Sequence, residues 1–409
     1  MPKLLQINSV VNKGSTGRIA EQIGDFGLKL GWKSFIAHGR GGGESVSETI
    51  KIGNSFDSKF HAIESRLFDN HGFSSRKATL NLTSQITQIN PDIIHLHNLH
   101  GYYLNYKLLF EYLNSIKIPI VWTLHDCWAF TGHCTFFSDI NCNKWETECN
   151  HCPKLKNYPA SVLYDNSRNN FLLKRNVFNS NENLTLVPVS NWLGGVIKKS
   201  FLKNIPMNVI QNGVDLTTFS PIDSIKVIEE KYSIKNKKIL LGVATSWGAR
   251  KGLADYFKLA ERISQDYIIV LVGLSKKQIE SLPSNIVGIE RTERISALNE
   301  LYSAAHIVLN LSNQESFGMT TVEGYASGTP SIVYNCTASP ELITPETGLI
   351  IEAGNIEALV NAIEQITKNG KSYYSLNCRK LAESKFDKNK KYDEYFKLYE
   401  SLLNNSPIH

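Results

Sequence analysis

The feature that most constrains the fold is an alternation of short β-branched runs with longer amphipathic stretches, which occurs twice along the chain. Runs such as Lys3–Val10 and Asp92–His97 are predicted to be strands, and Arg18–Leu30 is predicted to be a helix. Strands that alternate with helices favour a parallel sheet covered on both faces. The same pattern returns from Lys238 onward. The 409-residue chain therefore predicts two doubly wound α/β domains in tandem.

Turn residues mark the boundary between the two halves. The first half is predicted to end with a short strand, Met207–Ile210, and the turn signals NGVD at 212–215 and SP at 220–221 follow it. Near the C-terminus, aromatic residues recur at helical spacing from Tyr392 to Tyr399 and predict a closing helix that packs back on the first domain. The predicted parts are residues 1–211, residues 212–390 and the closing helix over 391–409.

Composition and charge exclude several classes of protein. Apolar residues make up 42% and charged residues 20% of the chain, as in ordinary soluble domains. No apolar run approaches the ~20 residues needed to span a bilayer, and no secretory leader is recognisable, so we expect a cytoplasmic protein. A formal charge of +6 suits an anionic ligand but is too small to favour nucleic acid.

One basic cluster predicts a contact with the membrane. Lys198, Lys199 and Lys203 would suit anionic lipid heads at the inner face of the cell membrane, which predicts peripheral association there. Charges that are simply solvated are the default interpretation of such a cluster.

Two carboxylates flank a predicted helix start. Glu315 lies in a loop after a strand, and the helix that begins near Gly318 contains Glu323. The amides of the first helical turn have no partners within the helix and suit a phosphate, while Glu323 could accept hydroxyl hydrogen bonds from a ribose. The alternative is two surface glutamates beside an ordinary helix start.

These residues occur with other motifs in a characteristic order. ESFG at 315–318 is followed by Glu323 and by ASGTP at 326–330. NGVD at 212–215 precedes Phe219, RKG at 250–252 follows a strand, and DIIHLH at 92–97 and HD at 125–126 end N-terminal strands. Together they resemble the GT-B retaining glycosyltransferases of family 4 over nearly the whole chain. HNLHGYY at 97–103 and HDCWAFTGHC at 125–134 resemble, more narrowly, the enzymes of bacterial capsule, exopolysaccharide and O-antigen synthesis, including the colanic-acid type.

The resemblance implies a fold and an activity. The fold would be GT-B, with two Rossmann-like domains facing across a cleft, the N-terminal one on the acceptor side and the C-terminal one holding the donor. The activity would be retaining transfer of a hexose from a UDP- or GDP-linked sugar to a lipid-linked saccharide acceptor. Fixed cations would stabilise the leaving diphosphate, so catalysis would need no metal or other cofactor.

The resemblance also implies roles for residues of the donor site. Glu323 would hold the ribose, Glu315 the donor sugar, Lys251 the diphosphate, and His125 the donor sugar from the opposing domain. Ser246 stands where the family usually has an arginine, and Arg250 is the candidate to supply that charge. His125, Glu315 and Lys251 are the predicted catalytic residues. The remaining predicted donor-binding residues are Gly17, Ser246, Arg250, Phe317, Gly318, Met319 and Thr320.

Acceptor-side residues are expected at the ends of the N-terminal strands. The turn GSTGR at 14–18 opens a helix and could approach phosphate or acceptor, although it is also an ordinary strand-to-helix turn. Tyr102 and Tyr103 are expected at the surface of a saccharide site, and polar packing at strand ends is the alternative for the histidines. The predicted acceptor-side residues are Gly14, Arg18, His97, Asn98, His100, Tyr102 and Tyr103.

Five of the seven cysteines lie between Cys127 and Cys152, which predicts a Cys-rich insertion over residues 127–153. The predicted ligands of a structural zinc are Cys134, Cys142, Cys149 and Cys152, of which the last two form a close C-x2-C pair. Cys127, His133 and His151 are alternative ligands. Reduced buried thiols or a redox-sensitive pair are the alternatives to zinc.

Two other functions remain open at this point. A nucleotide-sugar epimerase or hydrolase on the same fold would turn over donor without acceptor. A zinc-stapled binding protein without catalysis would bind no nucleotide sugar.

Overall fold

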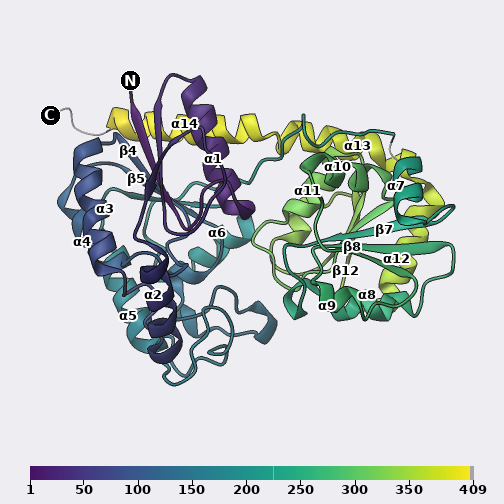
Figure 1. Cartoon of the computed structure of the whole chain (residues 1–409), viewed down its shortest axis with the longest axis horizontal. Coiled ribbons are helices and arrows are strands. Elements are labelled where there is room, and N and C mark those ends of the chain that lie inside the picture. The colour runs from purple at the N-terminus through teal and green to yellow at the C-terminus, as the bar shows by residue number, and fades with distance from the viewer. Residues whose placement is uncertain (224, 406–409) are drawn as a thin grey trace. The chain divides into compact units, whose positions relative to one another are not determined.

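The computed structural model describes residues 1–223 and 225–405, and the chain divides into two compact units (Figure 1). Of the described residues, Met1–Ile210 and 392–405 form one unit, and those of Gln211–Lys391 form the other. These divisions fall within one residue of the predicted ends at residues 211 and 390. The last four positions of the predicted closing helix, 406–409, lie outside the described residues.

The first unit is built on a six-stranded sheet in which all strands are parallel. In spatial order the strands are β3 (Glu48–Lys51), β2 (Lys33–His38), β1 (Lys3–Asn8), β4 (Ile93–Leu96), β5 (Ile120–Leu124) and β6 (Leu184–Pro188). The chain winds outward in one direction from β1 to β3 and in the other from β4 to β6. This is the doubly wound arrangement, in which ligands bind outside the carboxyl ends of the strands near the change of direction.

Helices cover this sheet, and one predicted strand is absent. The helices are α1 (Gly14–Lys29), α2 (Ser55–Phe68), α3 (Arg76–Ile89), α4 (Tyr106–Ser115), α5 (Ser167–Phe178), α6 (Asn191–Ile197) and the part of α14 (Lys388–Asn405) that begins at Tyr392. The prediction of a strand over Met207–Ile210 is wrong, because only Met207 forms a bridge, to Leu186 of β6. The last residue of β6, Pro188, has no amide hydrogen to donate to Asn208, so the ladder does not continue.

The aromatic side chains of α14 complete the core of the first unit. Phe396 packs edge-on against Trp32 with ring centroids 5.2 Å apart, and it also contacts Phe26 of α1. The hydroxyls of Tyr395 and Tyr399 hydrogen-bond within the same core, to Thr123 and to His95. Figure 1 shows α14, in yellow, running beside α1. The helix thus buries apolar area that α1 and the sheet would otherwise expose.

The second unit repeats the architecture with its own six-stranded parallel sheet. In spatial order its strands are β12 (Gly348–Ile351), β11 (Ser331–Tyr334), β10 (Ile307–Asn310), β7 (Lys238–Val243), β8 (Tyr267–Val272) and β9 (Ile286–Ile289). Its helices are α7 (Ile225–Tyr232), α8 (Leu253–Ala260), α9 (Lys276–Ile279), α10 (Ile295–Ala304), α11 (Met319–Ala326), α12 (Ile356–Asn369) and α13 (Lys371–Lys385). The prediction of two doubly wound α/β sheets is confirmed.

Residues 212–215 pair with the segment just before α14 inside the second unit. Val214 forms a parallel bridge with Asp387, and the Lys388 ammonium lies 2.6 Å from the Asp215 carboxylate. The NGVD sequence, where the chain enters this unit, is therefore bound to the segment through which the chain leaves it. Among the described helices, none combines the length and the apolar character that a membrane span requires.

Substitution of Phe396 tests the contribution of α14 to the first unit. Phe396 is 1% exposed, so Phe396→Ala should lower the free energy of unfolding by about 3–5 kcal/mol, the usual cost of truncating a buried phenylalanine. Chemical denaturation monitored by circular dichroism measures this. Leu376→Ala on α13, where the side chain is 61% exposed, is the control and should change it by less than about 0.5 kcal/mol. Equal effects of the two substitutions would contradict the packing of α14.

Candidate functional site

A lysine–glutamate ion pair lies at the carboxyl ends of two adjacent strands in the second unit. Lys251 ends the short 3-10 helix η4 (Ala249–Lys251), after β7, and its ammonium pairs with the carboxylate of Glu315, which follows β10. The side chains are 16% and 12% exposed, respectively. β7 and β10 are hydrogen-bonded neighbours, so the loops that follow them meet at the same edge of the sheet. The two residues that the resemblance assigned to the diphosphate and the sugar are therefore in direct contact.

Backbone contacts bring these two loops together. Gly252 has φ +68°, and a Cβ there would lie 2.1 Å from the carbonyl oxygen of Leu311, so only glycine allows this approach. The amide of Asn313 donates to the carbonyl of Arg250 at 3.0 Å, and the Arg250 guanidinium donates to the carbonyl of Gln314 at 3.2 Å. Arg250 thus lies beside the ion pair, whereas Ser246 is exposed in the loop after β7.

The charge on Glu315 is maintained by its neighbours. Burial alone would raise the pKa of Glu315, but the charge and hydrogen bond of Lys251, the charge of Arg250 and a hydrogen bond from Ser312 outweigh it and hold the pKa below its usual value. Glu315 is therefore a carboxylate at neutral pH. Any group that draws Lys251 away must leave Glu315 another partner, because an unpaired buried carboxylate is costly.

The helix start after Glu315 has the geometry of an anion site. Gly318 precedes α11 with φ +111°, a conformation that favours glycine, and a Cβ there would meet Leu342 at 3.0 Å. Met319 and Thr320 open the helix, and their amides have no acceptor within it. Phe317, 2% exposed, packs edge-on against Phe386 and anchors the turn. These amides lie at the end of the connection between β10 and α11, and Lys251 lies beside that connection through its pairing with Glu315.

Glu323 lies one turn further along α11 and is buried. Its carboxylate accepts a hydrogen bond from the hydroxyl of Tyr302 at 2.8 Å. Tyr302 belongs to α10 and was not predicted, since no local pattern connects it with a residue 21 positions away. The ribose role of Glu323 is compatible with this contact, because a carboxylate accepts several hydrogen bonds.

In the first unit, histidines meet at the ends of β4 and β5. Nδ1 of His97 lies 3.2 Å from Nε2 of His125, and Nε2 of His97 lies 3.0 Å from the amide oxygen of Gln6 on β1. Burial, partly opposed by the charge of Asp126, lowers the pKa of His125 to about 4. His125 is therefore neutral at pH 7. Gln6 was also not predicted, although a polar residue within the buried strand KLLQIN was the signal that could have revealed it.

The predicted acceptor-side residues differ in exposure. Asn98, His100 and Tyr102 are partly buried near these strand ends, and His100 hydrogen-bonds to the Asp126 carboxylate at 2.8 Å. The prediction that Tyr103 lies at a saccharide surface is wrong. Its side chain is 1% exposed and its hydroxyl donates to the Asn98 carbonyl, because burying an aromatic ring at this strand end is more favourable than exposing it.

The glycine turn after β1 places three further predicted residues. Gly14 begins α1 and is exposed, as is Arg18 one turn later. Gly17 is buried, and its carbonyl accepts a hydrogen bond from the amide of Asn12 at 3.0 Å. The turn therefore packs through Gly17 and leaves Gly14 and Arg18 accessible.

The cysteine segment contains only 3-10 helices before α5: η1 (Trp128–Phe130), η2 (Ser138–Ile140) and η3 (Lys144–Glu146). Cys134, Cys142, Cys149 and Cys152 line one small cavity of about 10 Å³. A hydrogen bond from the Cys134 thiol lowers the pKa of Cys152 to about 7. As their side chains stand, no three Cys, His, Asp or Glu residues in the described ranges 1–223 and 225–405 are arranged to hold a metal.

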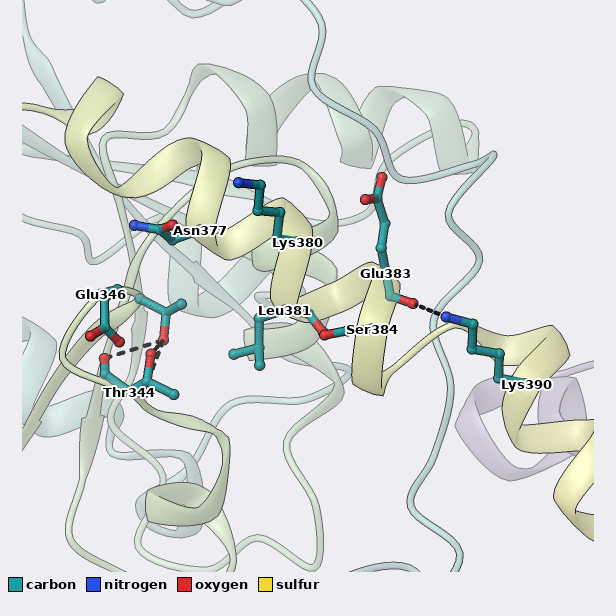
Figure 2. A pocket seen from close by; sticks show the side chains of 9 residues that line it. Thr344, Glu346, Asn377, Lys380, Leu381, Glu383, Ser384 and Lys390 are labelled. Atoms are coloured by element: carbon teal, nitrogen blue, oxygen red, sulfur yellow. Dashed lines mark hydrogen bonds between the residues drawn. The ribbon is translucent and has the colours of Figure 1, made fainter.

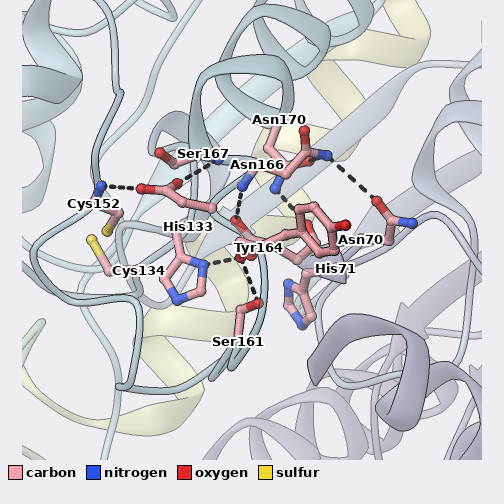
Figure 3. A network of polar contacts seen from close by, with 12 residues as sticks. Asn70, His71, His133, Cys134, Cys152, Ser161, Tyr164, Asn166, Ser167 and Asn170 are labelled. Atoms are coloured by element: carbon pink, nitrogen blue, oxygen red, sulfur yellow. Dashed lines mark hydrogen bonds and ion pairs between the residues drawn. The ribbon is translucent and has the colours of Figure 1, made fainter. Parts of the chain in front are cut away.

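Cys134 and Cys152 lie beside a network of polar contacts (Figure 3). His133 pairs with Asp69 at 2.6 Å, and both side chains are fully buried. Asp69 also accepts from the amide of Asn166, and Asp165 accepts from the amide of Cys152 at 2.6 Å. The irregular segment is thus tied to the end of α2 and the start of α5 by hydrogen bonds, of which the one between His133 and Asp69 is fully buried.

A separate pocket of about 630 Å³ lies in the second unit and is shown in Figure 2. It contains none of the predicted donor-binding residues. Thr344 and Thr347 line it at the amino end of β12, together with Lys380 and Glu383 of α13. Ligands of doubly wound sheets bind at the opposite, carboxyl ends of the strands, so this pocket is not a candidate for the donor.

Comparison with known families and proteins connects the chain to sugar transfer. Residues 224–383 match the family model described as Glycosyl transferases group 1. The chain is 28% identical over 243 residues to a protein of Escherichia coli K12 named as the colanic acid biosynthesis glycosyl transferase WcaC. It is 23% identical over 223 residues to an Escherichia coli UDP-Gal:alpha-D-GlcNAc-diphosphoundecaprenol alpha-1,3-galactosyltransferase. The alignments cover 56% and 51% of this chain and 58% of either relative.

Solved structures share the fold along the whole chain. Anabaena Alr3699/HepE, solved in complex with UDP-glucose, superposes with a TM-score of 0.70 at 14% identity and covers 98% of this chain and 99% of its own. At this identity the likeness establishes the two-sheet fold.

Removal of the Lys251 charge tests the ion pair. The depressed pKa of Glu315 means that the pair stabilises the fold at neutral pH and that this contribution is lost as pH falls through the folded-state pKa. Lys251→Met should therefore raise the pKa of Glu315, since burial then dominates. It should also lower the free energy of unfolding at pH 7 by about 3 kcal/mol. Carboxyl ¹³C shifts during a pH titration measure the first effect, and denaturation measures the second.

A matched control is available on α8. Lys258 pairs with Asp255 at 2.9 Å but is 59% exposed, so Lys258→Met should change stability by less than about 0.5 kcal/mol. An unchanged Glu315 pKa in Lys251→Met would contradict the assignment of the pair.

Proposed function

We propose, from the premise that residues 224–383 form a group 1 glycosyl transferase domain, that the chain transfers a sugar from a nucleotide-sugar donor to a saccharide acceptor in bacterial surface polysaccharide synthesis. One of the relatives is named for colanic acid biosynthesis and the other as a galactosyltransferase. Transfer with retention of the anomeric configuration, a hexose as the transferred sugar and catalysis without a metal are further parts of the proposal.

The observation that carries the proposal is the clustering of anion-binding groups after β7 and β10. Lys251 and Arg250 come from one loop, and the amides of α11 come from the other. Lysine, arginine and helix-start amides are the groups that bind a diphosphate. A purely structural ion pair would not require the free helix start beside it.

The chemistry of sugar transfer explains why these groups would be needed. Cleavage of the sugar–phosphate bond leaves negative charge on the diphosphate and develops positive charge on the sugar. Lys251 and Arg250 would stabilise the leaving group electrostatically, and the carboxylate of Glu315 would lie near the sugar cation. Fixed cations can thus take over the role that a metal plays elsewhere.

The remaining predicted contacts concern recognition. Glu323 would accept hydrogen bonds from the ribose hydroxyls while it keeps its bond from Tyr302. His125, neutral at pH 7, would contact the donor sugar. We also propose a UDP- or GDP-linked donor, a lipid-linked acceptor and a peripheral contact with anionic lipid. One relative acts on a diphosphoundecaprenol-linked sugar, and a structural neighbour was solved with UDP-glucose.

A structural zinc is proposed separately for Cys134, Cys142, Cys149 and Cys152. In its favour, the four thiols line one cavity in a segment without α-helix or strand, where a metal would replace missing secondary structure. The side chains would have to turn toward a common point to bind it, and no catalytic step is assigned to the metal.

A thermal-shift panel of nucleoside diphosphates and nucleotide sugars tests the donor site. A ligand that binds only the folded state stabilises it by about 2.7 kcal/mol at 100 times its dissociation constant, so one base family should raise the midpoint selectively. Glu323→Ala should weaken this binding at least tenfold, since a carboxylate hydrogen bond is worth roughly 1.5–3 kcal/mol.

Glu346→Ala is the matched control, because Glu346 lines the pocket of Figure 2 and not the donor site. It should leave the shift unchanged. If folded wild-type protein shows no shift with any nucleotide sugar, the proposed function is wrong.

Native mass spectrometry of reduced protein purified without chelator tests the zinc. One zinc per chain is expected, and Cys149→Ser with Cys152→Ser should abolish it, whereas Cys336→Ser in the second unit should retain it. Metal-free wild-type protein would exclude the zinc and leave the cysteines as buried thiols.

A further inference from the structure

A line of three hydrogen-bonded side chains runs across the first sheet toward its carboxyl edge. Gln6 on β1, His97 after β4 and His125 after β5 come from three adjacent strands. Gln6 contacts Nε2 of His97 at 3.0 Å, and Nδ1 of His97 contacts Nε2 of His125 at 3.2 Å. The two imidazole rings are nearly parallel, with an interplanar angle of 20°. Only His125, at the end of this line, is partly exposed.

The direction of each hydrogen bond follows from the first residue. The side-chain NH₂ of Gln6 donates to the carbonyl oxygen of Ala20 at 2.7 Å, and a flipped amide would place two acceptors face to face there. The amide oxygen of Gln6 is therefore the atom that faces His97, and it can only accept. Nε2 of His97 must carry the hydrogen.

The tautomer of His97 then determines that of His125. His97 is 1% exposed, and no carboxylate in the described part of the chain hydrogen-bonds to it, so the ring is neutral. Burial and the nearby histidines hold the pKa of His97 well below its usual value, in agreement with this. A neutral ring protonated at Nε2 has an accepting Nδ1. Nε2 of His125 must therefore donate, and Nδ1 of His125 is left with its lone pair.

The neighbouring charged and titratable groups do not compete for this nitrogen. Asp126 hydrogen-bonds to His100 and to the amide of Trp128. His95 is engaged by Thr123 and Tyr399. Across the residues that the structure describes, no hydrogen bond to Nδ1 of His125 is present, so this acceptor is available to a ligand.

We propose that Gln6 and His97 are positioning residues that hold His125 in the Nε2-protonated tautomer, so that its Nδ1 accepts a hydrogen bond from a sugar hydroxyl and disfavours an anionic group. The role of His125 toward the sugar rests on the proposed function; the tautomer does not. The site then selects a neutral hydroxyl-bearing sugar over its uronic acid counterpart, because a lone pair facing a carboxylate is repulsive.

The tautomer can be measured directly in the wild-type chain. Long-range ¹H–¹⁵N spectra of histidine-labelled protein distinguish protonated from bare ring nitrogens, and His125→Asn identifies the signals of His125 by their loss. Protonated Nε2 and bare Nδ1 are expected for His125 between pH 6 and 8. A His125 protonated at Nδ1 would overturn the proposal, and this result requires no activity and no ligand.

A variant separates positioning from simple packing. Gln6→Glu places a carboxylate against His97 and should charge that ring, so that His97 donates from both nitrogens and the proton of His125 moves to Nδ1. A sugar hydroxyl can also accept from Nδ1–H, so the neutral sugar should still bind, whereas the preference for it over its uronic acid counterpart should fall roughly tenfold. Gln22→Glu is the control, since Gln22 of α1 also accepts a partly buried hydrogen bond, from Tyr392, but does not contact His97 or His125. It should leave both the tautomer and the preference unchanged.

The preference for a neutral sugar gives a second readout. The nucleotide sugar that stabilises the wild-type chain most should bind at least tenfold more tightly than its uronic acid counterpart. Equal binding of the two would overturn the selectivity. If no nucleotide sugar binds at all, the proposed function fails, while the spectrum of His125 still decides the tautomer.

Discussion

The ion pair of Lys251 and Glu315 is the interaction on which the candidate donor site depends, because a buried carboxylate stays charged only beside a fixed cation. Its existence requires two loops to approach closely, and Gly252 with its positive φ permits that approach. The same loops present Arg250 and the start of α11. The close approach of the two loops, the buried ion pair and the start of α11 therefore depend on one another.

A comparable constraint operates in the first unit, with hydrogen-bond direction in place of charge. Gln6 can only accept from His97, and the consequence passes along the rings to His125. The ion pair and the histidine hydrogen bonds both lie at the carboxyl ends of central strands, where parallel neighbours bring side chains from distant segments together. Burial makes the charge pairing and the hydrogen-bond directions obligatory, because an unsatisfied polar group there costs far more than one in water.

The Cys-rich segment follows a different principle. It has no strand or long helix to position its side chains, and its order comes from contacts such as the buried pair of His133 with Asp69 and the exposed hydrogen bond of Cys152 with Asp165. A segment of this kind lies between β5, which ends beside His125, and α5. The segment directly follows His125 in the chain, so a change in its conformation should alter the environment of His125, with or without a bound metal.

The sequence by itself determined the two sheets and the identity of most candidate residues, because hydrophobic periodicity and turn chemistry are local. The predicted strands Lys3–Val10 and Asp92–His97 and the predicted helix Arg18–Leu30 correspond to β1, β4 and α1, with ends that differ by no more than four residues. The short edge strands β3 and β12, the burial of Tyr103 and the partner of Glu323 were decided by the tertiary structure alone. Gln6 and His97 are 91 positions apart. Contacts across such separations depend on strand order and packing, which no local pattern encodes.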